Sequence, residues 1–123
     1  MDINEIQAQT RSMRALYVED DNEVRRQTAK ILRLFFHQVT DCGDAQEGID
    51  KFKAGKADIV FTDINMPGMS GLEMLERIKQ IDPSVKTVIF SAYDESKFFT
   101  KAISIGVDGY ILKPFTTEDL LSV

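Results

Sequence analysis

Three acids, a serine and a lysine are the side chains of this sequence best suited to joint chemistry. Each follows a short apolar run: Glu19 and Asp20 follow the first run, Asp63 the third, Ser91 the fourth and Lys113 the fifth. An aspartate in such a place is by itself an ordinary turn or capping residue, and the serine and the lysine have equally plain explanations. Four such endings in one chain favour a shared site, provided that the runs are strands of one parallel sheet.

The acids indicate what chemistry such a site would carry. Two carboxylates about 4 Å apart repel each other by about 4 kcal/mol at an effective dielectric constant near 20, so a cluster of them needs a cation. Oxygen ligands of this kind suit Mg²⁺. With its charge neutralised, Asp63 is a competent nucleophile towards phosphorus, and Ser91 and Lys113 can bind phosphoryl oxygens. The set contains no histidine or other good base, so a stoichiometric, self-reversing modification fits better than rapid hydrolysis.

The elements that would bring these residues together alternate between strand and helix. Short apolar runs predict strands at residues 15–18, 38–42, 59–61, 87–90 and 110–112. Capping residues and amphipathic spacing predict helices from Asn22, after Asp44, after Ser70, over about residues 94–105, and a short last one from Thr116. Five β-α repeats predict a five-stranded parallel sheet with helices on both faces, the (βα)5 flavodoxin-like doubly wound arrangement.

The composition describes one acidic domain of 123 residues, 43% hydrophobic and 28% charged. A formal charge of −5 argues against direct binding of nucleic acid by this domain. The first strand is followed by no glycine-rich loop, which disfavours dinucleotide and flavin cofactors. With Cys42 as the only cysteine and no run long enough to span a membrane, we expect a cytoplasmic protein. Residues 1–13 are expected to form an N-terminal extension to a domain over residues 14–123, excised from a longer chain.

Several short motifs together resemble the receiver domain of bacterial two-component response regulators, over nearly the whole chain. They are Glu19-Asp20, Asp63 with Met66-Pro67-Gly68, Ser91-Ala92, and Tyr110 ahead of Lys113-Pro114. The resemblance implies a phosphorylation-switched signalling module and not an enzyme with a catalytic cycle. Its partners would be a sensor histidine kinase or phosphotransfer protein, and an output domain or downstream partner.

The resemblance also implies a role for each matching residue. Asp63 would be the phosphoacceptor, with Ser91 and Lys113 binding the phosphoryl group. Mg²⁺ would be held by Asp20 and Asp63 directly, by Glu19 indirectly and by the backbone carbonyl of Asn65. Asp21 is interpreted as the cap of the first helix.

A switch and an output surface follow from the same resemblance. Phosphorylation would draw Ser91 towards the phosphoryl group and let Tyr110 rotate inward, which changes the face formed by the fourth helix, the fifth strand and the last helix. The fourth helix carries two apolar stripes, and the second stripe has no expected place in the core. We therefore expect Phe99, Ile103 and Tyr110 to contribute to a partner or dimer surface.

Two other functions remain open at this stage. A phosphatase of the haloacid-dehalogenase type also uses an aspartate nucleophile and Mg²⁺, but it needs a second aspartate where this sequence has Asn65. A receiver that only docks, without phosphorylation, is disfavoured because every acceptor-site residue is present. Asn65 and Tyr93 each stand two residues past a site residue, where we expect them to control water access to the phosphoryl group.

Overall fold

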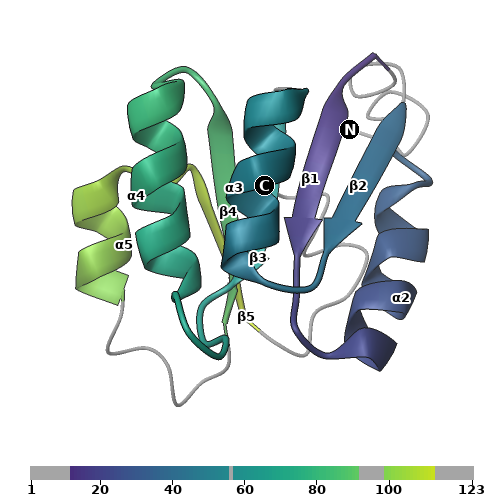
Figure 1. Ribbon diagram of the computed structural model, residues 1–123, viewed down its shortest axis with the longest axis horizontal. Coiled ribbons are helices and arrows are strands. Elements are labelled where there is room, and N and C mark those ends of the chain that lie inside the picture. The colour runs from purple at the N-terminus through teal and green to yellow at the C-terminus, as the bar shows by residue number, and fades with distance from the viewer. Residues whose placement is uncertain (1–11, 56, 92–98, 113–123) are drawn as a thin grey trace.

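A single sheet of five parallel strands organises the chain, and the computed structural model describes residues 12–55, 57–91 and 99–112. The strands are β1 (Arg14–Val18), β2 (Gln38–Cys42), β3 (Ile59–Asp63), β4 (Lys86–Ser91) and β5 (Gly109–Leu112). The helices are α2 (Asn22–Leu32), α3 (Ala45–Ala54), α4 (Gly71–Ile81) and α5 (Phe99–Ile105). The strand order β2-β1-β3-β4-β5 confirms the predicted flavodoxin-like doubly wound fold (Figure 1).

Different helices cover the two faces of the sheet (Figure 1). On one face, Leu32 of α2 belongs to the same core cluster as Phe61 of β3. On the other, α3, α4 and α5 contribute Phe52, Leu75 and Ala102 to a second cluster. All five residues of β3 are buried, as expected for a central strand covered on both sides. Within the described ranges, no helix combines the length and apolar character that crossing a membrane requires.

The register of the strands fixes which residues meet at the carboxyl edge of the sheet. Val18 of β1 lies opposite Thr62 of β3, and Asp63 lies opposite Phe90 of β4. The residues that follow Val18 therefore emerge beside Asp63, and Ser91 emerges one strand further along. This edge is where open α/β sheets build their sites.

The helices begin at the polar residues predicted to cap them. The side chain of Asp21 accepts two backbone N–H groups of the first turn of α2, and Asp44 and Ser70 each accept one from α3 and α4. The first turn of α3 differs in one detail from a standard capping box, in which the residue three positions after the cap accepts the backbone N–H of the cap itself. There Glu47 Oε1 accepts the backbone N–H of Gly43 at 2.8 Å, one residue before the expected cap. At the other end of the chain, Gly106 has a φ of 88° and ends α5 as predicted.

One member of the apolar stripe of α2 is not buried. Val24 shares the helical spacing of the core residues, yet it is 38% exposed. It lies in the first turn of α2, next to the loop from β1, whereas Thr28 and Leu32 further along the helix are buried. Other expectations lie outside the described residues: the N-terminal extension up to residue 11, the start of the fourth helix at residues 94–98, and the last helix from Thr116.

Candidate functional site

Three acids meet at the carboxyl edge of the sheet. Glu19 and Asp20 follow β1, Asp63 ends β3, and one carboxylate oxygen of each lies within 4.8 Å of the others. Glu19 and Asp63 are buried, with 2% and 9% of their surface exposed, whereas Asp20 is open to solvent. The structure thus brings together the three acids that the sequence singled out.

The backbone of Asp63 is held by a close contact with the start of α4. The Thr62 hydroxyl donates to the Asp63 carbonyl oxygen at 2.9 Å, and the Gly71 N–H donates to the Ile64 carbonyl at 2.8 Å. A Cβ atom on Gly71 would lie 1.9 Å from the Asp63 carbonyl oxygen, so this position admits only glycine without movement of the backbone. No role was predicted for Gly71 from the sequence, although a glycine directly after a helix cap was a usable signal.

The loop that carries Glu19 and Asp20 is fixed from two sides. The Glu19 N–H donates to the Cys42 carbonyl at 3.0 Å, and Arg25 Nη1 donates to the Glu19 carbonyl at 2.7 Å. The Asp21 N–H donates to Glu19 Oε2 at 3.3 Å. Arg25 was also missed, because a charged residue on a helix surface carries no signal of its own in a single sequence.

Ser91 and Tyr110, the two predicted switch residues, are in direct contact. The Tyr110 hydroxyl donates a hydrogen bond to Ser91 Oγ at 2.9 Å. Ser91 is fully buried, and the half-buried Tyr110 ring packs against the core on the side of α3, α4 and α5. The Tyr110 ring therefore points inward, so its hydroxyl is bonded within the protein.

The electrostatics of the acid cluster favour a bound cation. At 4.8 Å, the upper limit of the separation between these oxygens, two carboxylates repel by about 3.5 kcal/mol for an effective dielectric constant of about 20. Burial raises the pKa of the Tyr17 hydroxyl above its ordinary range, and the negative charges of Glu19 and Asp63 add to this rise. Three carboxylates at one loop edge form the all-oxygen donor set that a hard divalent cation such as Mg²⁺ prefers.

Several predicted site residues lie outside what the structure describes. They are Lys113, Tyr93 and the side chain of Phe99. Asn65 is described and exposed, two residues past Asp63. Ile103 is 61% exposed on α5, as expected for the second apolar stripe of that helix.

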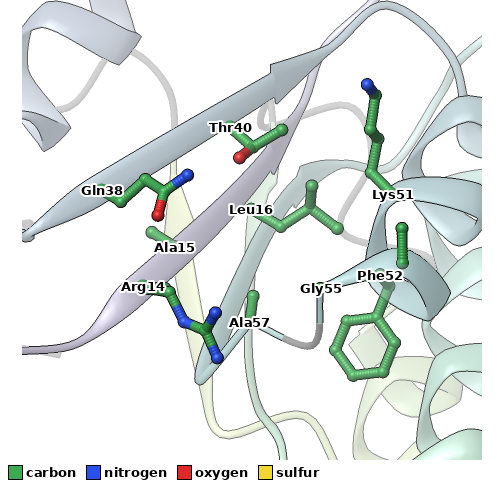
Figure 2. A pocket seen from close by; sticks show the side chains of 10 residues that line it. Arg14, Ala15, Leu16, Gln38, Thr40, Lys51, Phe52, Gly55 and Ala57 are labelled. Atoms are coloured by element: carbon green, nitrogen blue, oxygen red, sulfur yellow. The ribbon is translucent and has the colours of Figure 1, made fainter.

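A separate cavity of about 260 Å³ lies at the other edge of the sheet, between β1, β2 and α3 (Figure 2). Arg14 and Gln38, which line it, are the first residues of their strands, while the acid cluster follows the last ones. Among the described residues that line this cavity there is no carboxylate. The cavity is therefore not part of the acid site.

Comparisons with known proteins agree with this geometry. The response regulator receiver domain family matches residues 15–123. The chain is 36% identical over 111 residues to the chemotaxis protein CheY of Treponema pallidum, covering 88% of this chain and 77% of CheY. It is 34% identical over 105 residues to the nitrate/nitrite response regulator protein NarL of Escherichia coli, covering 83% of this chain and 49% of NarL. The chain thus spans about half the length of NarL.

A solved structure supports the same assignment of the fold. The N-terminal domain of an uncharacterized protein from Wolinella succinogenes superposes with a TM-score of 0.83 at 37% sequence identity, over 90% of each chain. Together with the five-stranded parallel sheet and the acids at its carboxyl edge, the match over residues 15–123 shows that this chain belongs to the receiver domain family of response regulators, which are signalling switches.

Proposed function

We propose that this receiver domain accepts a phosphoryl group on Asp63 in a reaction that depends on Mg²⁺. The observation that carries the proposal is the acid cluster, in which the carboxylate oxygens of Glu19, Asp20 and Asp63 come within 4.8 Å of one another. Asp63 is the natural acceptor because it ends the central strand and its backbone is held by Thr62 and Gly71. A nucleophile fixed in this way loses little freedom when it reacts.

The chemistry is a direct transfer to the Asp63 carboxylate. One carboxylate oxygen forms a bond to phosphorus, the bond from phosphorus to the leaving group breaks, and the leaving group keeps the electron pair. Asp20 and Asp63 would hold Mg²⁺ directly, with Asn65 through its carbonyl and Glu19 through water. Bound Mg²⁺ would neutralise the acids and the oxygens of the incoming phosphoryl group. Ser91 and Lys113 would bind the transferred group.

The donor would be a sensor histidine kinase or a phosphotransfer protein, and the response would pass to an output domain or partner. The hydrogen bond between Tyr110 and Ser91 supports this route, because it couples a movement of the serine hydroxyl to the tyrosine side chain.

Ile103, exposed on α5, would contribute to the responding surface with Phe99 and Tyr110. We expect Ile103→Ser to weaken dimerisation or partner binding, while Lys101→Ser on the same helix does not. Equal binding by both variants, measured by sedimentation, would remove Ile103 from this surface.

One experiment separates this function from its alternatives. The protein is incubated with acetyl phosphate and Mg²⁺, and its intact mass and the released phosphate are measured. One added phosphoryl group that is lost in Asp63→Asn and with EDTA supports the proposal. Sustained release of phosphate would support a phosphatase, although Asn65 stands where that class needs an aspartate. If no adduct forms, the result would support a domain that only docks to a partner and is not phosphorylated.

The lifetime of the phosphoryl group is a finer part of the proposal. Asn65 and Tyr93 would limit the access of water, and the exposed position of Asn65 close to Asp63 supports its part in this. Decay of the adduct in Asn65→Ala and Tyr93→Ala is followed by mass after removal of acetyl phosphate. Wild-type decay in both variants would end this part of the proposal.

A further inference from the structure

Arg25 of α2 joins three segments next to the acid cluster. Its Nη1 donates to the Glu19 carbonyl at 2.7 Å, its Nη2 donates to Asn22 Oδ1 at 2.6 Å, and its Nε lies 3.3 Å from Asp41 Oδ2 on β2. These segments are the loop after β1, the first turn of α2 and the edge strand β2, which lies beside α2 in Figure 1. The side chain is only 20% exposed. With three bonded partners and a mostly buried side chain, Arg25 differs from an arginine in an ordinary surface ion pair, which has one partner and is open to solvent.

We infer that Arg25 is a positioning residue for the metal-binding acids, an inference that rests on the Mg²⁺ site proposed above. Arg25 fixes the carbonyl of Glu19 while the N–H of Glu19 is bonded to the Cys42 carbonyl, so both sides of that residue are held. The backbone direction at Glu19 sets where the carboxylates of Glu19 and Asp20 point. Loss of Arg25 therefore disorganises two of the three acids through the backbone of Glu19.

The guanidinium of Arg25 is also packed against the loop that follows β2. A Cβ atom on Gly43 would come 3.1 Å from Arg25 Nη1, so the loop after β2 lies directly against the arginine. Asp41 is shared with a second arginine, since Arg33 Nη2 lies 3.1 Å from Asp41 Oδ1. Arg33 donates in addition to the Val39 carbonyl at 3.2 Å. Its partners Val39 and Asp41 both belong to β2 and not to the loop that carries Glu19 and Asp20. Arg33 is therefore a matched control for Arg25.

Charge and position predict opposite results when Arg25 is removed. The guanidinium is a positive charge close to an acid cluster, so by Coulomb's law alone its removal would strengthen the binding of a divalent cation. If Arg25 positions the acids, its removal weakens binding, because partners that orient metal ligands typically contribute about 10- to 100-fold to metal affinity. The direction of the change therefore decides between the two.

The test is the Mg²⁺ dissociation constant, measured by isothermal titration calorimetry on the wild-type chain, Arg25→Ala, Arg25→Lys and Arg33→Ala. We expect Arg25→Ala to bind Mg²⁺ at least about tenfold more weakly and Arg33→Ala to stay within about twofold of wild type. Arg25→Lys keeps the charge but loses the forked geometry, so we expect weaker binding there as well. Unchanged or tighter binding by Arg25→Ala would overturn the inference, and an equal loss in Arg33→Ala would do the same.

Three measurements keep this result distinct from other failures. If the wild-type chain binds no Mg²⁺, the proposed function fails, whereas a wild-type chain that binds and an Arg25→Ala variant that binds equally well refute only the inference. If Arg25→Ala does not fold by circular dichroism, Arg25→Lys decides, and wild-type Mg²⁺ affinity in that variant would refute the positioning role. At saturating Mg²⁺ the phosphorylation rate of Arg25→Lys should return to within about twofold of wild type, because the role concerns metal binding.

Discussion

Replacing Gly71 by alanine tests how Asp63 is held. The new methyl group would lie 1.9 Å from the Asp63 carbonyl oxygen and 3.0 Å from its carbonyl carbon, whereas ordinary contacts begin at 3.4 Å. Relief of this clash needs a relative movement of about 1.5 Å between β3 and the start of α4. Overpacking costs about 1–3 kcal/mol, and we expect the upper end because the crowded atoms are backbone.

The expected effects concern both stability and reaction rate. A loss of about 3 kcal/mol corresponds to a melting temperature roughly 10 °C lower for a domain of this size. A displacement of about 1 Å at a reacting group can cost about 100-fold in rate, so we expect Asp63 to be phosphorylated at least about tenfold more slowly. Melting is followed by far-UV circular dichroism, and phosphorylation by intact mass with acetyl phosphate and Mg²⁺.

Gly48→Ala is the matched control, since it makes the same chemical change at another buried helical position. Its Cβ would lie 2.8 Å from Val18 Cγ2 and 2.9 Å from Met74 Sδ, which are side-chain atoms that can move. We expect a smaller loss of stability, partly offset by the better helix propensity of alanine, and a phosphorylation rate within about twofold of wild type. If Gly71→Ala melts and reacts like Gly48→Ala, the contact with the Asp63 carbonyl does not position the acceptor.

Four further outcomes can be measured on the same chain. Asp21→Ala removes the acceptor for two N–H groups at the start of α2 and should cost about 1 kcal/mol in urea unfolding, with Asp21→Asn close to wild type. Tyr110→Phe removes the hydrogen-bond donor to buried Ser91 and should lower the free energy of unfolding by about 1 kcal/mol. An unchanged midpoint of urea unfolding would show that this hydrogen bond does not contribute to stability. Burial raises the pKa of the Cys42 thiol from 9.0 to about 12, so the folded chain holds this proton more tightly than the unfolded chain. The stability that this difference contributes is fully present below pH 9.0 and is lost as the pH rises towards 12. The free energy of unfolding should therefore fall less steeply with pH in Cys42→Ala than in the wild-type chain over that range. Native Cys42 should also react slowly with a disulfide reagent at pH 8, and fast reaction without denaturant would contradict its burial.

The order of the elements and the place of the acid site could be predicted from the sequence. Apolar runs and helical spacing locate the elements, and Asp21, Asp44 and Ser70 mark where helices begin. Alternating β and α elements force a parallel sheet, and a parallel sheet places the ends of its strands at one edge. That topology places Glu19 and Asp63, 44 positions apart, at the same edge of the sheet, while the strand order and the register make them neighbours there.

Only the tertiary structure decided what holds the residues of the site in place. The contact of Gly71 with the Asp63 carbonyl, the bonds of Arg25 to the Glu19 carbonyl and to Asp41, and the bond from Tyr110 to Ser91 each join different elements. The exposure of Val24 belongs here too, because helical spacing gives the direction of a side chain and not the extent of the sheet beneath it. Periodicity in one chain records which face of an element is apolar. It does not record the distances between side chains of separate elements, and those distances fix the geometry of the site.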